Sequence, residues 1–197
     1  MFVLPPLAIL LIATVALLFS NRLPSPTPIA ATPSGQIAPF FTPEVRYWEQ
    51  NILIWSQTYQ LDANLIATVM QIESCGDPFA RSPAGASGLF QVMPYHFAEG
   101  ENVFDVEINA KRGLSYLQKA WTKSQGDVRL TLAAYNGGMT RLSQQESLWP
   151  AETQRYVYWG SGIYEDARQG RDMSPRLQEW LEHGGWSLCL QARARQP

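Results

Sequence analysis

The first apolar stretch of the chain runs from Phe2 to Phe19 and is interrupted only by Pro5, Pro6 and Thr14. At about 1.5 Å of rise per residue, a helix of this length just reaches across the hydrocarbon core of a bilayer. The pattern predicts a membrane anchor or a signal segment over residues 1–20. An anchor is favoured over a cleaved secretory signal, because no complete small-x-small cleavage pattern follows; a buried helix of the globular domain is the remaining alternative.

Residues 21–42 are rich in proline, which occurs at Pro24, Pro26, Pro28, Pro33 and Pro39 and is mixed with Ser, Thr and Ala. A stretch of this composition buries little apolar surface, and its prolines favour extended chain. It predicts a semi-rigid linker between the N-terminal segment and a domain over residues 43–197.

Beyond the linker, apolar residues recur at helical spacing and no long stretch alternates with the period of a strand. Thr42-Pro43-Glu44 is typical of a helix start, and this helix is expected to reach about Tyr59. Asp62 is the expected N-cap of a helix over about 63–74, which Gly76 ends. Residues 76–94 are expected to form a loop with one short helix.

The second half of the chain continues this pattern. A helix is predicted over about 109–123, another follows the N-cap Asp127 and ends at Gly137-Gly138, and a long one runs from Pro150 to about 167. Ser174-Pro175 starts a last helix, which Gly184-Gly185 is expected to end. The fold class is therefore mainly α, with a C-terminal helical extension from about residue 169.

Composition narrows the function classes. The formal net charge is −2, so no strong positive field favours a nucleic-acid partner. His96 and His183 do not have the spacing of metal ligands, and neither a metal nor a cofactor is expected. The two cysteines, Cys75 and Cys189, predict a disulfide if the domain is extracytoplasmic; two free thiols are the alternative.

Glu73 is the strongest candidate for catalysis. It stands at the end of an apolar helical run, just before the break at Cys75-Gly76. Burial among apolar side chains raises the pKa of a carboxyl group, so that it can stay protonated near neutral pH. A protonated carboxyl is the general acid needed to protonate a leaving oxygen.

Four short motifs follow one another in the sequence: Glu73-Ser74 with Pro78, Ser87-Gly88-Leu89-Phe90-Gln91 with Met93-Pro94, Ala134-Tyr135-Asn136-Gly137, and Glu152-Thr153 with Tyr156-Val157. In this order and spacing, residues 44–168 closely resemble the catalytic domain of lytic transglycosylases. That domain has a lysozyme-like helical fold with a substrate groove and is related to goose-type lysozyme.

The resemblance implies a reaction on peptidoglycan glycan strands. One glutamate, here Glu73, would act as acid and then as base on the β-1,4 bond between N-acetylmuramic acid and N-acetylglucosamine. The acetamido group of the muramic acid would stabilise the developing positive charge, so no second carboxylate is required. The C6 hydroxyl would close on C1 and yield a 1,6-anhydro product.

The resemblance also implies sugar contacts in the loop Ser87, Gly88, Leu89, Phe90 and Gln91, and at Tyr135 and Asn136. It groups Tyr156 with these substrate-site residues and places its hydroxyl to hydrogen-bond Glu73 and orient it. Phe90 stands where the family often has methionine, and its ring is expected to pack against a sugar face. From the residues alone, Ser87 and Gln91 could form a polar turn, Tyr135-Asn136 could close a helix, and Tyr156 could belong to the core.

Other functions stay open on the sequence. A lysozyme-type hydrolase would cleave the same bond with water. A non-catalytic, membrane-tethered module could bind the cell wall, although it would not need the Glu73 acid. A thiol amidase using Cys75 and His96 would lack an orienting residue and would be inactivated by a disulfide. The expected location is extracytoplasmic, with membrane attachment through the N-terminal segment or secretion if that segment is cleaved.

Overall fold

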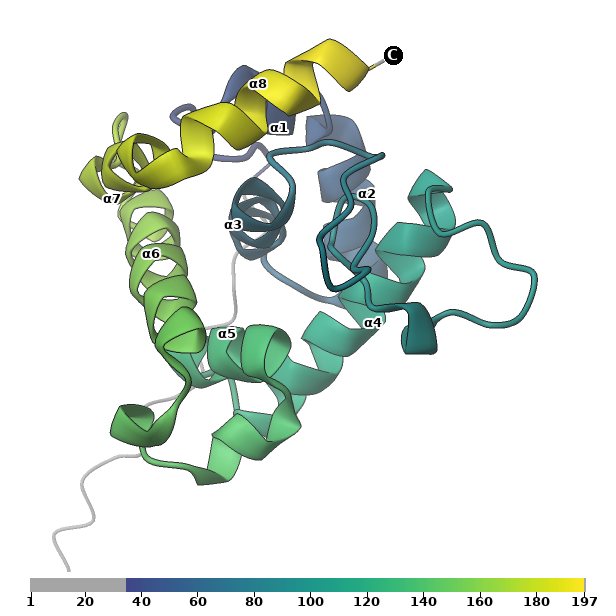
Figure 1. Ribbon diagram of the computed structural model, residues 1–197. Coiled ribbons are helices and arrows are strands. Elements are labelled where there is room, and N and C mark those ends of the chain that lie inside the picture. The colour runs from purple at the N-terminus through teal and green to yellow at the C-terminus, as the bar shows by residue number, and fades with distance from the viewer. Residues whose placement is uncertain (1–34, 197) are drawn as a thin grey trace, which may run out of the picture.

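The computed structural model describes residues 35–196, which fold as a helical domain around the central helix α3 (Figure 1). The predicted anchor and most of the predicted linker lie outside the described residues. The helices are α1 (Pro43–Arg46), α2 (Glu49–Tyr59), α3 (Ala63–Glu73), α4 (Val106–Lys123), α5 (Val128–Gly137), α6 (Ala151–Arg168), α7 (Pro175–Trp180) and α8 (Trp186–Arg195). Short 3-10 turns cover Pro94–His96, Met139–Ser143 and Glu146–Leu148. Residues 35–196 contain no strand, only isolated bridges that pair Ser87 with Arg81 and with Val92.

Aspartate side chains cap the starts of α3 and α5, as the sequence predicts. The Asp62 carboxylate accepts hydrogen bonds from the amides of Asn64 (2.8 Å) and Leu65 (3.4 Å) at the start of α3. Asp127 caps α5 through the Leu130 amide (2.9 Å). Such caps satisfy amides that have no partner within the helix.

Two helix boundaries and the start of the packed domain differ from the prediction. The first helix is broken after Arg46, and the Thr42 side chain donates to Gln71 Oε1 (3.2 Å) instead of capping α1. Helix α4 begins earlier than expected, because Asp105 caps it through the Ile108 amide (2.9 Å). The packed domain also extends into the predicted linker, since Ile37 and Phe41 are buried in its core.

The helical stretch that begins at Pro175 is broken at Gly184, as predicted, but it is not the last helix of the chain. Gly184 adopts a φ of +116°, which turns the chain, and α8 follows directly. This helix crosses the end of α3 (Figure 1) and is joined to it by the Cys75–Cys189 disulfide. The disulfide expected from the sequence is thus confirmed.

Ion pairs also hold α8 on the domain. Arg193 binds the buried carboxylate of Glu44 at 2.7 Å, and Arg195 reaches the buried carboxylate of Asp77 at 3.1 Å. Because Asp77 follows the end of α3 by four residues, the C-terminal helix braces the segment immediately after Glu73.

Candidate active site

Glu73 is the last residue of α3, and the chain that follows it is fixed by several polar contacts. Ser74 Oγ donates to the Leu89 carbonyl oxygen (2.8 Å), which ties the helix end to the 82–92 loop. Trp48 Nε1 donates to the Gly76 carbonyl oxygen (2.8 Å). Gly76 has a φ of +81°, and a Cβ there would lie 2.6 Å from the Glu44 carbonyl oxygen, so only glycine fits this turn.

The 82–92 loop is held against α4 by one buried side chain, Asn109. Its Oδ1 accepts from the Phe90 amide (3.0 Å), and its Nδ2 donates to the Ser87 carbonyl oxygen (2.7 Å). Gly88 makes this contact possible, because a Cβ at that position would lie 2.3 Å from Asn109 Nδ2.

The opposite wall comes from the end of α5 and the start of α6. Tyr135 donates its hydroxyl to the Phe90 carbonyl oxygen (2.8 Å), which connects α5 to the same loop. Asn136 Oδ1 accepts from Thr153 Oγ1 of α6 (2.9 Å). The loop, α5 and α6 are therefore linked around the end of α3.

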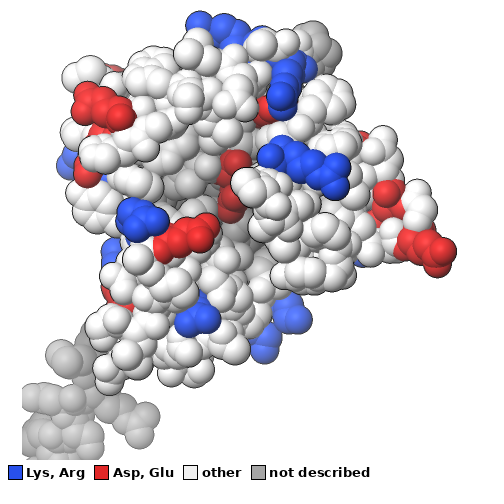
Figure 2. All heavy atoms as spheres, in the orientation of Figure 1, with Lys and Arg blue, Asp and Glu red and all other residues white. Residues whose placement is uncertain are grey.

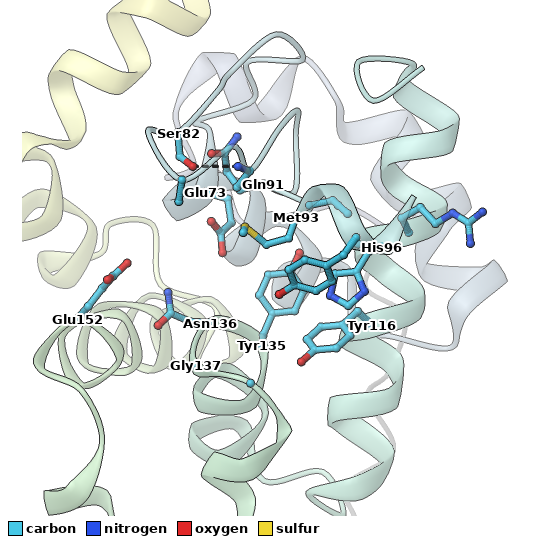
Figure 3. Close-up of a pocket in the computed structure, with 17 residues that line it drawn as sticks. Glu73, Ser82, Gln91, Met93, His96, Tyr116, Tyr135, Asn136, Gly137 and Glu152 are labelled. Atoms are coloured by element: carbon cyan, nitrogen blue, oxygen red, sulfur yellow. Dashed lines mark hydrogen bonds between the residues drawn. The ribbon is translucent and has the colours of Figure 1, made fainter. Parts of the chain in front are cut away.

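These elements enclose an open cavity of about 390 Å³. Figure 2 shows a hollow near the middle of this face, with acidic side chains set inside it. In the close-up, Glu73 points into the cavity between the loop and α5, Glu152 lies on the α6 side, and His96 and Tyr116 lie at the other end (Figure 3). The residues that line the cavity are Glu73, Ser82, Ala84, Ala86, Gln91, Val92, Met93, Tyr95, His96, Arg112, Gly113, Tyr116, Tyr135, Asn136, Gly137, Gly138 and Glu152.

The electrostatics of the cavity favour a neutral Glu73. Although part of this side chain faces the cavity, burial of the carboxyl raises its pKa from an ordinary 4.5 to about 8, and the negative charge of Glu152 adds to the increase. An interaction with the Tyr156 hydroxyl acts in the opposite direction, although that hydroxyl is buried and does not reach full hydrogen-bond geometry with any described residue. At pH 7 the Glu73 carboxyl is therefore mostly protonated and can donate a proton.

Comparison with known sequences identifies the family. The family model described as "Transglycosylase SLT domain" matches residues 50–156, which is more than half of the chain and includes the segments around the cavity. The chain belongs to the transglycosylase SLT domain family.

Curated relatives carry related names. A transglycosylase of Enterobacteria phage PRD1 is 35% identical over 111 residues, covering 55% of this chain and 40% of the phage protein. Membrane-bound lytic murein transglycosylase D of Escherichia coli is 28% identical over 106 residues, covering 50% of this chain and 24% of that protein. The chain thus matches less than half the length of each of these relatives.

Solved structures agree on the fold. The 70 kDa soluble lytic transglycosylase from Escherichia coli superposes with a TM-score of 0.53 at 23% identity, covering 65% of this chain and 25% of that one. An inactive mutant of the lytic transglycosylase Slt from Pseudomonas aeruginosa gives a TM-score of 0.51 at 21% identity, covering 64% and 25% of the two chains. The SLT domain described here accordingly has the lysozyme-like helical fold that its sequence predicts.

The structure brings some of the predicted site residues of this SLT domain together and separates others. Glu73, Gln91, Tyr135 and Asn136 line the cavity. Ser87 is buried and donates its hydroxyl to the Gly85 carbonyl oxygen (3.1 Å).

The expected sugar contact of the Phe90 ring needs correction. Phe90 and Leu89 are fully buried, and the Phe90 ring packs against Trp55 with centroids 5.7 Å apart. The hydrogen bonds to Asn109 and Tyr135 hold the loop backbone so that these two side chains point into the core. Gly88 accommodates Asn109 rather than lining the cavity, and Tyr156 is buried beside Glu73 without lining it.

Other residues of the cavity wall were not predicted. Ser82 and Met93 belong to the motif segment, so their neighbourhood in sequence was the available signal. Nothing in the sequence indicated that Tyr116 lines the cavity, because this residue lies on α4, outside the four motifs. The position of the His96 ring depends on stacking against other rings. Its centroid lies 4.5 Å from that of Tyr95 and 4.9 Å from that of Tyr116.

Two further observations concern metals and membranes. Within residues 35–196, Glu44, Cys75 and Cys189 form the one group whose ligand atoms lie close enough together to hold a metal ion. The two cysteine sulfurs are bonded to each other in the disulfide, so neither is a thiolate that could bind a metal. Among the same residues, no helix has both the length and the apolarity to cross a bilayer.

Proposed function

We propose that this chain is a lytic transglycosylase that cleaves the β-1,4 bond between N-acetylmuramic acid and N-acetylglucosamine in peptidoglycan, with Glu73 as its single acid and base. The observation that carries the proposal is the Glu73 carboxyl at the end of α3, facing an open cavity with a pKa raised to about 8. Membership of the SLT domain family supports the substrate class.

In the first step, the neutral Glu73 carboxyl gives its proton to the glycosidic oxygen, and the bond from that oxygen to C1 of the muramic acid breaks. The 2-acetamido oxygen of the same sugar stabilises the positive charge that develops at C1. The N-acetylglucosamine side leaves with a free hydroxyl, and Glu73 is left as a carboxylate.

In the second step, the Glu73 carboxylate removes the proton of the C6 hydroxyl of the muramic acid. The C6 oxygen then bonds to C1, which gives the 1,6-anhydro end and restores the neutral carboxyl. Giving up a proton in the first step and taking one back in the second suits a group whose pKa lies close to the working pH.

The cavity walls have matching roles in this proposal. Gln91, Tyr135 and Asn136 present polar groups beside Glu73, where a glycan strand would lie. Tyr156 orients Glu73 from within the core and lowers its pKa. The backbone of the loop from Ser87 to Phe90 shapes this wall, although the side chains of Leu89 and Phe90 are turned inward.

A hydrolase of the same bond is the second candidate. Glu152 lines the cavity together with Glu73, so two carboxyl groups face one space, as glycosidases that use water require. In the transglycosylase proposal, Glu152 takes no part in proton transfer, and its negative charge only raises the pKa of Glu73.

Product analysis separates the two functions. The purified protein would be incubated with sacculi, and the masses of the released muropeptides would be measured by mass spectrometry. A transglycosylase releases anhydro products that are lighter by one water than the reducing products of a hydrolase. Reducing products alone would replace the proposed reaction with hydrolysis, and no products at all would reject both.

The proposal includes a location. We propose that the domain, whose core includes Ile37 and Phe41, is extracytoplasmic, is tethered or exported by residues 1–20, and is spaced from the membrane by the part of residues 21–42 that precedes Ile37. The Cys75–Cys189 disulfide supports an oxidising compartment.

A further inference from the structure

A second, smaller hollow adjoins the Tyr116 end of the active-site cavity. Its volume is about 230 Å³, and it is lined by His96, Lys111, Arg112, Ser115, Tyr116 and Lys119. Three of these residues, His96, Arg112 and Tyr116, also line the active-site cavity, so the two spaces share a wall. We call this second space the α4 hollow.

The positions of the α4 residues explain the arrangement. Lys111, Ser115 and Lys119 follow one another at intervals of four and form an exposed stripe along α4. Arg112 and Tyr116 form the neighbouring stripe, which faces the active-site cavity. The α4 hollow is therefore the outer continuation of the active-site wall along this helix.

The charges in the α4 hollow are not balanced. Arg112 makes a two-pronged ion pair with Glu101, at 2.9 Å from Nε and 2.6 Å from Nη2. Lys111 and Lys119 form no ion pair with any residue of 35–196, although the charge of Lys111 helps to lower the pKa of Glu101. The lining of the hollow holds three cations and no carboxylate. The nearby acids are Glu101, which pairs with Arg112, and Glu107, one turn before Lys111 on α4, so the positive charge is still in local excess on a chain whose net charge is −2.

The positive charge reaches the shared wall. Burial first, and the charge of Lys119 second, lower the pKa of His96. This favours the neutral form of the His96 ring, which is stacked between Tyr95 and Tyr116.

We infer that the α4 hollow is an accessory subsite that binds the carboxylates of a peptide stem on the glycan strand occupying the active-site cavity. This inference rests on the proposed function. A neutral glycan backbone has no negative charge that could pair with Lys111 and Lys119. A peptide stem, in contrast, branches from the muramic acid and ends in a carboxylate. The shared wall lets one strand occupy both spaces.

The test measures binding in the Glu73→Gln background, where strands would not be consumed. Soluble glycan strands that carry peptide stems are compared, by calorimetry, with strands from which an amidase has removed the stems. Lys111→Gln/Lys119→Gln is expected to raise the Kd for stem-bearing strands about fivefold, within the range for two exposed ion pairs, and to leave the Kd for stripped strands unchanged.

Lys123→Gln is the matched control, because it removes the same charge from the exposed end of α4 outside the hollow. It should leave both Kd values unchanged. Equal weakening on both strands, or no weakening by the double variant, would overturn the inference. Turnover of sacculi by the wild-type protein is measured separately, so failure of the proposed function is recognised independently of this result.

Discussion

Glu73 owes its chemistry to the groups that surround one carboxyl. Burial raises its pKa, Glu152 raises it further, and Tyr156 lowers it. In the proposed mechanism the acid form of Glu73 is the proton donor, so activity should be high below the pKa of Glu73 and fall as the pH rises through about 8. The two neighbours therefore give predictions of opposite sign.

Glu152→Gln removes the negative charge on the α6 side of the cavity. The pKa of Glu73 should then decrease, and the alkaline fall in kcat/KM should move to lower pH. A pH profile of wild type and variant on the same strands measures this shift. If Glu152 were instead a catalytic base, the variant would lose most of its activity at every pH.

Tyr156→Phe removes the hydroxyl that lowers the pKa of Glu73, so the alkaline fall should move to higher pH. The hydroxyl makes no full hydrogen bond within residues 35–196, and its loss should cost less than about 1 kcal/mol of unfolding free energy. Activity should decrease more than stability, because Glu73 loses an orienting neighbour. A folded variant with an unshifted profile and wild-type activity would assign Tyr156 to the core alone.

At the scale of elements, the loop over residues 82–92 depends on Gly88. Gly88→Ala forces a side chain into a φ of +76° and places its Cβ against the Asn109 amide. Gly170→Ala is the matched control, because Gly170 has a φ of +66° but no atom within 4 Å of the added Cβ. In chemical denaturation, Gly88→Ala should lose about 1–3 kcal/mol more than Gly170→Ala, and equal losses would contradict the proposed role of this contact.

Helix α8 gives the second prediction for an element. The Cys75–Cys189 disulfide closes a sequence separation of 114, and the chain-entropy model gives about 4–5 kcal/mol as an upper bound for its contribution. Reduction should lower the Tm and speed amide hydrogen exchange in α8 before α3. If exchange in α8 were unchanged on reduction, the ion pairs of Arg193 and Arg195 would be sufficient to hold the helix.

The sequence predicts most elements because their signals are local. Asp62 and Asp127 cap helices wherever the rest of the chain lies, and Glu73 is recognisable from its motif. The inward turn of Phe90 depends on Asn109 and Tyr135, which are 19 and 45 residues away. Helix α8 was missed because Gly184-Gly185 has the composition of a helix end, while the contacts that favour continuation come from Cys75, Glu44 and Asp77.

At the scale of the whole molecule, the fold serves to hold one helix end. The 82–92 loop and α8 attach to the segment that follows Glu73, through Ser74 and Cys75 respectively, and α5 attaches to the same loop through Tyr135. Each of these attachments brings a different part of the sequence to one point. We expect substitutions that loosen any of them to affect catalysis through the position of Glu73.

Glu73→Gln tests the central claim most directly. The variant keeps the shape of the side chain but has no proton of suitable acidity to transfer. The rate at which anhydro muropeptides are released from sacculi should fall by more than about a hundredfold, while the Tm stays close to that of the wild type. Release of anhydro products at the wild-type rate by a folded Glu73→Gln protein would contradict the account.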